Sequence, residues 1–236
     1  MKILSWNCRR GLLSIEKYEK LLGVGSDIAV IPECVHPSKI QNTKHFDSVW
    51  KGKEGGIGLG IFSFSNDYQF SLLEDKIKYE WFIPIKVTGK TDFILIAVWM
   101  IRTPGYSSYG KLLYTALMEY EHLLKNERVI IIGDFNIDKK LATSYSGISR
   151  GQGFEKIIDI FSRYNIESCY HSLNHEEYGR ESKATYYHYN HADKPFHIDY
   201  CFVNEELLQN VTKFTIGDYE EWHRYSDHSP IIVDIL

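Results

Sequence analysis

Ile130-Ile131-Ile132-Gly133-Asp134-Phe135-Asn136 is the stretch of sequence that says most about the fold and its chemistry. It is a hydrophobic strand that ends in a glycine, with an Asp and an Asn two positions apart directly after it. Polar side chains at the end of a buried strand are held rigidly at the rim of a sheet and stay open to a ligand. The stretch therefore predicts a sheet whose edge carries functional groups.

Other short apolar runs rich in Ile, Val, Phe and Tyr surround this strand in the sequence. The runs at 59–62 and 93–98 are apolar on both faces, which suits strands that lie between other layers. Strands often follow one another without a helix between them, which predicts mixed sheets rather than strict βαβ alternation. We expect strands at 2–6, 27–32, 57–64, 81–87, 93–100, 128–133, 197–203 and 229–236, and helices at 14–24, 109–125 and 153–164.

The length and net charge of the chain limit the classes of protein to which it can belong. The 236 residues show no repeat and no linker-like break, so we expect one domain over residues 1–236, with the Ser-, Thr- and Gly-rich segment 143–153 as a long loop. A net charge of −4 excludes a generic polycation that binds nucleic acid by charge alone, but not a local basic groove. Because no apolar run is long enough to cross a bilayer and the first residues turn polar too soon for a signal peptide, we expect a soluble, cytoplasmic protein. We also expect a monomer.

Five segments place polar residues at the ends of apolar strands. Together they supply four carboxylates, two carboxamides and two imidazoles, a set dominated by the hard oxygen ligands that suit Mg²⁺ or Mn²⁺ better than zinc. Such a set favours phosphoester hydrolysis, which needs a cation, a carboxylate to activate water and a donor for the developing charge. The segments are Trp6-Asn7-Cys8, Pro32-Glu33-Cys34, Gly133-Asp134-Phe135-Asn136, Phe196-His197-Ile198-Asp199-Tyr200 and Tyr225-Ser226-Asp227-His228-Ser229-Pro230.

Taken singly, most of these residues have a simpler interpretation. Asn7 could be a turn former, Glu33 a solvated charge, and Asp134 with Asn136 an Asx turn. Asp199 is harder to dismiss, because a carboxylate buried in an apolar strand without a partner costs several kcal/mol. Only the five segments taken together favour a catalytic site.

In their order and spacing these segments resemble the endonuclease/exonuclease/phosphatase superfamily, which includes abasic-site endonucleases and DNase I-like nucleases. The resemblance spans nearly the whole chain and ends within a few residues of its C-terminus. It implies an α/β fold, a four-layer sandwich of two mixed β-sheets packed face to face with helices outside. The motifs that carry it are Trp6-Asn7, Pro32-Glu33, the glycine-led strand 56–63, Gly133-Asp134-Phe135-Asn136, Ile198-Asp199-Tyr200 and Ser226-Asp227-His228-Ser229-Pro230.

The resemblance also implies a division of roles. Glu33 would be the principal ligand of a Mg²⁺ or Mn²⁺ ion, adjoined by Asn7 and Asp227. The remaining motif residues would carry the reaction: Asp134 would activate the attacking water, Asn136 would position that water or stabilise the transition state, His228 would contact the scissile phosphate, and Asp199 would hydrogen-bond the His228 ring and favour its protonated form.

The chain departs from the family pattern after the strand at 93–98. The family commonly presents a Tyr or His to the phosphate there, whereas this sequence has Trp99, which can donate only through its indole N–H. Arg102 could replace the missing phosphate contact, or it could be a solvated loop charge. A catalytically inactive member that only binds phosphorylated ligands is therefore one alternative.

The loops around the rim, and not the fold, choose the substrate. Arg9-Arg10, Lys139-Lys140 and the aromatic segment 185–189 favour DNA, with Arg10 and Tyr186 as expected contacts beside Trp99 and Arg102. Solvated basic faces and ordinary strand packing would explain the same residues. We expect a Mg²⁺-dependent DNA phosphodiesterase, with phospholipid or inositol-phosphate head groups as the alternative substrates.

Overall fold

Two mixed six-stranded sheets form the centre of the computed structural model, which describes residues 1–12, 14–53, 55–73, 78–126, 128–142 and 153–236. Within each sheet one central pair of strands is parallel, β1 with β2 and β7 with β8, and the other pairs are antiparallel. The first sheet has the order β13 (Val211–Ile216), β14 (Ile231–Ile235), β1 (Lys2–Ser5), β2 (Ile28–Val35), β4 (Ile57–Ser63) and β3 (Asp47–Gly52). The second has the order β5 (Tyr68–Leu72), β6 (Phe82–Gly89), β7 (Phe93–Trp99), β8 (Val129–Asp134), β12 (Asp199–Asn204) and β9 (Ile166–Ser168).

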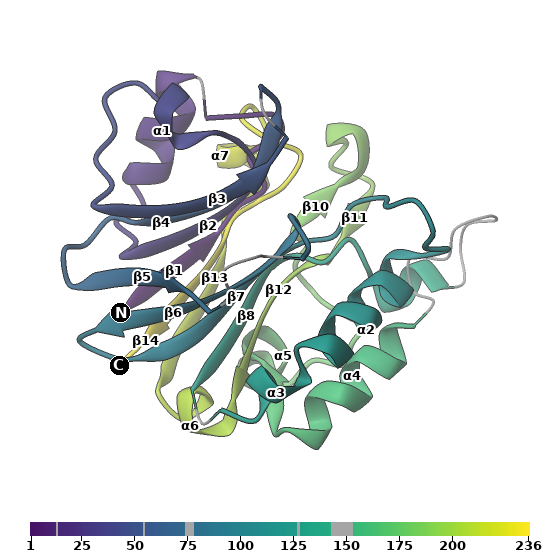
Figure 1. Cartoon of the computed structure of the whole chain (residues 1–236). Coiled ribbons are helices and arrows are strands. Elements are labelled where there is room, and N and C mark those ends of the chain that lie inside the picture. Colours follow the sequence, from purple (N-terminus) through teal and green to yellow (C-terminus); the bar gives the residue numbers. More distant parts are fainter. Residues whose placement is uncertain (13, 54, 74–77, 127, 143–152) are drawn as a thin grey trace.

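The sheets pack face to face and the main helices lie outside them (Figure 1). Side chains of both sheets form the central core, while separate apolar clusters join each sheet to its helices. The helices α1 (Ile15–Leu22) and α7 (Tyr219–Trp222) cover the first sheet, and α2 (Tyr109–Glu119), α3 (Glu121–Leu124) and α4 (Phe154–Arg163) cover the second. This arrangement confirms the predicted four-layer α/β sandwich.

Short elements complete the described chain. Two of them, β10 (Tyr186–Tyr187) and β11 (Pro195–Phe196), form a hairpin beside the end of the sandwich where β12 begins (Figure 1). The others are α5 (Cys169–Asn174), α6 (Glu205–Leu208) and the 3₁₀ turns η1 (Pro37–Lys39), η2 (Lys139–Ala142) and η3 (His188–Asn190). In the part of the chain that the structure describes, no helix has both the length and the apolar character that a membrane crossing requires.

Each expected strand is present, with bounds shifted by a few residues. The expected single helix at 109–125 is wrong, because Tyr120 leaves helical geometry (φ −96°, ψ 20°) and divides it into α2 and α3. The sequence did not predict β3, β5 and β13, whose residues are largely half-buried or exposed and so carry no strong apolar pattern. The expected loop at 143–153 lies outside the described residues, except for Gly153.

The central strands bring the polar segments to one end of the sandwich. β1, β2 and β8 end there, and β12 begins there, so that Asp134 lies beside Trp99 on one side and Asp199 on the other. Gly133 permits this close pairing, because a Cβ added to it would lie 1.8 Å from the Val98 carbonyl oxygen and its φ is +151°.

Candidate active site

Asp134 lies at the centre of the convergence, with its side chain fully buried. Its Oδ2 accepts hydrogen bonds from Asn7 Nδ2 at 3.0 Å and Asn136 Nδ2 at 2.9 Å, and its Oδ1 accepts one from the Asn136 backbone N–H at 2.9 Å. Asn7 is 127 residues away in the sequence and belongs to the other sheet. The carboxylate is therefore oriented by donors from both halves of the sandwich.

The orientation of the Asn136 amide is fixed by its second partner. Asn136 Nδ2 also donates to the Met100 carbonyl oxygen at 3.0 Å, and a carbonyl can only accept. Both amide hydrogens are then used, so Asn136 can present only its own carbonyl oxygen to a ligand. Its backbone is left-handed, with φ +52°, which Asn tolerates better than most residues.

Glu33 and Asn7 form the part of the site contributed by the first sheet. Asn7 Nδ2 donates to Glu33 Oε1 at 3.2 Å, and the Arg10 backbone N–H donates to Glu33 Oε2 at 3.1 Å. The pairing of β2 with β4 shifts register between Ile31 and Cys34, which places Glu33 on an irregularity of the strand. Arg9, Arg10 and Glu33 all have positive φ, and such strain persists only where surrounding contacts hold it.

His228 and Asp199 form a buried pair that joins the two sheets. The ring atom Nδ1 lies 2.9 Å from Asp199 Oδ2 and 3.2 Å from Oδ1, so Nδ1 carries a proton that it donates to the carboxylate. Nε2 lies 3.9 Å from Asp134 Oδ2. This confirms the expected contact between Asp199 and the His228 ring.

The burial and mutual charge of these groups shift their pKa values. Burial raises the pKa of Asp134, and the neighbouring Asp199 charge adds to that effect while His228 opposes it, giving a value of about 7. Burial disfavours the charged form of His228, but the carboxylates of Asp199 and Asp134 outweigh it and raise its pKa to about 9. At neutral pH the ring is therefore protonated, and Asp134 is poised to exchange a proton.

Other hydrogen bonds fasten the His228 segment to the first sheet. Trp6 Nε1 donates to the His228 carbonyl oxygen at 3.0 Å, and Ser226 Oγ donates to the Asn7 carbonyl oxygen at 2.7 Å. The His228 backbone N–H in turn donates to Ser226 Oγ at 3.1 Å. Sequence reasoning gave Trp6 and Ser226 no role, although both stand inside the motifs that drew attention to their neighbours.

The remaining predicted residues lie at different distances from this centre. The Tyr186 ring is 4.6 Å from the His228 ring, and Asp227 Oδ2 is 3.8 Å from Arg9 Nε. Trp99 is half-buried and packs against the core between the sheets, so most of its ring serves packing. Arg102 is exposed on the loop after β7, where it helps to line a hollow of about 310 Å³.

The donor set fits a hard divalent cation beside Glu33. Asn7 Nδ2 donates to the carboxylates of both Glu33 and the buried Asp134, and Asn7 Oδ1 accepts from the Arg9 backbone N–H, so carboxylate and amide oxygens gather here, the ligand type that such a cation prefers. Among the described residues, ligand atoms of Asp134, Asp199 and His228 also lie within 4.8 Å of one another. His228 is a poor metal ligand, however, because its Nδ1 is hydrogen-bonded to Asp199 and a protonated ring has no free lone pair on either nitrogen.

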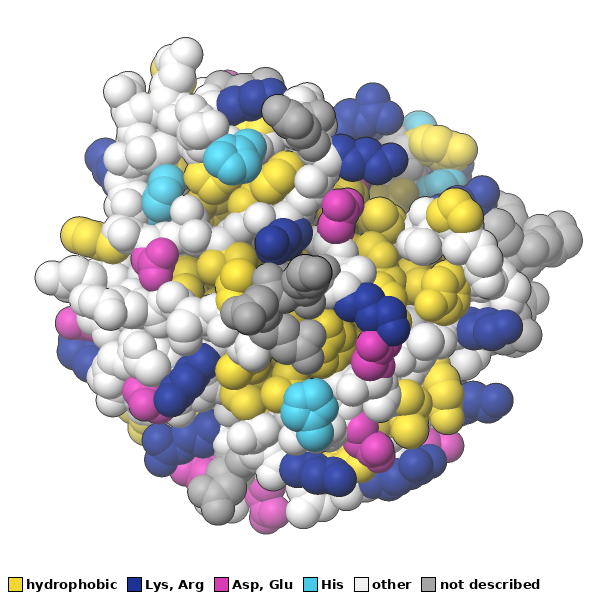
Figure 2. Space-filling model, viewed as in Figure 1, with side chains coloured by type: hydrophobic (Ala, Val, Ile, Leu, Met, Phe, Trp, Pro, Cys, Tyr) yellow, Lys and Arg dark blue, Asp and Glu magenta, His cyan; other side chains and the backbone are white. Residues whose placement is uncertain are grey.

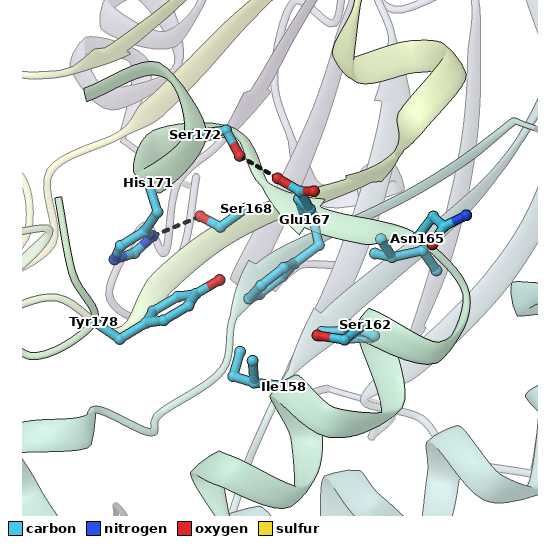
Figure 3. Close-up of a pocket in the computed structure, with 11 residues that line it drawn as sticks. Ile158, Ser162, Asn165, Glu167, Ser168, His171, Ser172 and Tyr178 are labelled. Atoms are coloured by element: carbon cyan, nitrogen blue, oxygen red, sulfur yellow. Dashed lines mark hydrogen bonds between the residues drawn. The ribbon is translucent and has the colours of Figure 1, made fainter. Parts of the chain in front are cut away.

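A second hollow, of about 380 Å³, lies between α4, β9 and α5 (Figure 3). Among its lining residues, His171 Nδ1 and Ser168 Oγ are hydrogen-bonded to each other at 2.8 Å, and Ser172 Oγ donates to Glu167 at 2.9 Å. None of the residues assigned to the candidate active site lines it.

No protein-family model and no curated protein sequence matches the chain significantly. Solved structures do match it over essentially its whole length. The 3′-5′ exonuclease NExo from Neisseria meningitidis has 21% identity and a TM-score of 0.72, covering 100% of this chain and 99% of its own. An AP endonuclease from Archaeoglobus fulgidus has 16% identity and a TM-score of 0.69, covering 100% and 99%.

The endonuclease domain of the telomere-specific retrotransposon TRAS1 is similar to the same degree, with 14% identity, a TM-score of 0.69 and coverage of 99% and 97%. At these identities the likeness establishes the fold. The chain thus shares the DNase I-like sandwich fold of these nucleases, the fold that the motifs had suggested.

Proposed function

We propose that this chain is a metal-dependent phosphoester hydrolase that acts on DNA. The observation that carries the proposal is the meeting of two buried hydrogen-bonded pairs, Asn7 with Asp134 and His228 with Asp199, at the end of the sandwich, where His228 Nε2 lies 3.9 Å from Asp134 Oδ2. A carboxylate with a pKa of about 7 beside a protonated imidazole is an acid–base pair matched to neutral pH.

Each group has a proposed task that its position supports. His228, protonated and fixed by Asp199 through Nδ1, directs its Nε2–H toward the region of Asp134, where it would donate to a phosphoryl oxygen. Asp134, oriented by Asn7 and Asn136, would accept a proton from the attacking water. Hydrolysis then proceeds by direct attack of that water on phosphorus, with the bond to the leaving oxygen breaking opposite it.

Glu33 would hold the cation, with Asn7 Oδ1 and Asp227 as further oxygen ligands directly or through water. Mg²⁺ suits this set, and Mn²⁺ would serve in its place. When bound, the cation would neutralise charge on the phosphoryl oxygens. The Glu33 carboxylate is itself held in one orientation, because the Asn7 amide donates to one of its oxygens and the Arg10 backbone N–H donates to the other.

DNA is the proposed substrate because the rim supplies a few cations and an aromatic ring beside the reacting groups. Arg9 and Arg10 are exposed next to Glu33, and the Tyr186 ring lies tilted against the His228 ring. One structure of NExo is described as bound to a product DNA hairpin, which supports the same substrate class here. Figure 2 shows acidic and basic side chains interspersed over one face, consistent with local contacts rather than a broad basic surface.

The test is hydrolysis of a panel of abasic, nicked, single-stranded and 5′- or 3′-blocked DNA, with lipid and inositol phosphates alongside, in Mg²⁺ and in EDTA. We expect Mg²⁺-dependent cleavage of at least one DNA form and none in EDTA. Asp134→Asn should lower kcat by about three orders of magnitude or more, because the lost base acts mainly in the transition state. The matched control, Asp159→Asn on the exposed face of α4, should retain wild-type turnover.

Three outcomes would contradict the proposal. They are near-normal turnover by folded Asp134→Asn, equal activity in EDTA, and turnover of the lipid or inositol phosphates with no cleavage of any DNA.

A further inference from the structure

Thr185 is a fully buried residue that precedes β10 and lies between the two halves of the candidate active site. Its hydroxyl Oγ1 accepts hydrogen bonds from the backbone N–H groups of Ile198 and Asp199, each at 3.0 Å. Its carbonyl oxygen accepts a hydrogen bond from the Ser229 backbone N–H at 2.8 Å. One residue therefore holds the backbone at Asp199 with its side chain and the backbone next to His228 with its main chain.

This connection matters because the Asp199–His228 pair crosses from one sheet to the other. Asp199 begins β12 in the second sheet, whereas His228 lies in the segment that leads into β14 in the first. The contacts of Trp6 and Ser226 fasten His228 to the first sheet only. A further contact must tie the Asp199 backbone to the His228 segment. Without it, only the hydrogen bond between the two side chains would set the distance from the Asp199 carboxylate to the His228 ring.

The segment that carries Thr185 supplies this restraint. Tyr186 pairs with His228 as an isolated bridge, and the Tyr187 N–H donates to the Asp227 carbonyl oxygen at 2.8 Å. The same short segment pairs with Phe196 through β10 and β11. The chain from 185 to 187 thus lies as a spacer between the start of β12 and the His228 segment, and Thr185 is the member that bonds directly to both.

We propose that Thr185 is a positioning residue that sets the distance between Asp199 and His228, and through it the placement of His228 Nε2 opposite Asp134. The inference rests on the proposed hydrolytic function and deepens it. Thr185 does not reach a substrate itself. Its contribution is to hold the pair in reacting geometry, where a displacement of about 1 Å can cost about 100-fold in rate.

The experiment compares Thr185→Val, which keeps the shape but removes the acceptor, with Thr185→Ser, which restores it. We expect Thr185→Val to lower kcat about 10- to 100-fold with KM changed less than about threefold, and Thr185→Ser to lie within about threefold of wild type. Ser63→Ala is the matched control. Ser63 is equally buried, and its hydroxyl donates to the Ser65 carbonyl oxygen at 2.7 Å with the Tyr68 carbonyl oxygen at 3.1 Å, at the end of the sheet opposite Glu33.

A second readout does not depend on turnover. The His228 Nδ1–H that is bonded to Asp199 should give a low-field proton NMR signal, assigned by its absence in His228→Gln. The signal should persist in wild type, Thr185→Ser and Ser63→Ala, and should weaken or shift in Thr185→Val. If Thr185→Val does not fold, Thr185→Ala removes the same acceptor with less steric demand and takes its place in both arms.

Equal loss of kcat in Thr185→Val and Ser63→Ala would overturn the inference, as would a change confined to KM. If the wild type hydrolyses no phosphoester, the proposed function fails, and the NMR measurement alone then tests whether Thr185 positions the Asp199–His228 pair. An unchanged Nδ1–H signal in Thr185→Val then refutes the positioning role, and its loss supports it.

Discussion

His197 should make the protein sensitive to mild acid. Its side chain is buried at 2% exposure, Nδ1 donates to the Lys183 carbonyl oxygen at 3.0 Å, and Nε2 is buried with no hydrogen-bond partner in the described structure. Burial lowers the pKa of His197 from 6.5 to about 4. The unfolded chain therefore binds a proton on this ring between pH 6.5 and 4, where the folded chain does not.

The sign and size of this effect of pH on stability follow from the linkage between proton binding and folding. Because the unfolded state takes up the extra proton, the contribution of His197 to the free energy of unfolding is full above pH 6.5 and is lost as the pH falls toward 4. With these two pKa values, the loss between pH 7 and pH 5 is about 2 kcal/mol. That is a sizeable part of the roughly 5–15 kcal/mol typical of a folded domain.

The assay is urea unfolding at pH 7 and pH 5 for the wild type and for His197→Asn, whose side-chain amide can still donate to Lys183 but does not titrate. Between pH 7 and pH 5 the wild type should lose about 2 kcal/mol more of its unfolding free energy than His197→Asn does. Other titrating groups cancel in this comparison. His191→Asn, at an exposed position, is the control and should follow the wild type. Parallel pH dependence in His197→Asn and wild type would refute the reasoning.

Three further predictions concern the candidate active site. Gly133→Ala should destabilise the fold by about 3 kcal/mol or more in urea unfolding, because the added Cβ meets the Val98 carbonyl oxygen at 1.8 Å and φ is +151°; a small change would contradict the backbone geometry. Trp6→Phe should cost about 1–3 kcal/mol and also reduce kcat, because the buried His228 carbonyl loses its donor; unchanged stability would show that water replaces it. Millimolar Mg²⁺ should raise the thermal unfolding midpoint of the wild type but not of Glu33→Gln, and an equal rise in both would place the cation elsewhere.

The central strands could be predicted from sequence because burial on both faces requires an unbroken apolar run. β7 and β8 have such runs, and the polar residues that follow them stand out sharply. The edge strand β3 could not be found, because each of its residues is only half-buried and either face tolerates polar side chains. The break at Tyr120 was missed for a related reason, since the apolar stripe continues on both sides of it.

The candidate site was predictable where a side chain carries the information. Asp199 was expected to need a partner because it stands in an apolar strand, and His228 provides it. Hydrogen bonds to main-chain groups could not be predicted in this way. The Met100 carbonyl that fixes the Asn136 amide, and the acceptor role of Thr185 toward two backbone N–H groups, depend on backbone positions that no residue pattern encodes.

The positive-φ residues around Glu33 have a consequence for how the protein could be made more robust. Arg9, Arg10, Glu33 and Asn136 hold left-handed backbones, each at a cost of about 1–2 kcal/mol to a non-glycine residue. Glycine at Arg9 or Arg10 would relieve backbone strain but would also loosen the segment whose Arg10 N–H orients the Glu33 carboxylate, and glycine at Glu33 or Asn136 would remove the carboxylate or the amide itself. Stabilisation against heat would therefore have to come from the outer layers of the fold, since a change at the rim alters the residues on which the proposed hydrolysis depends.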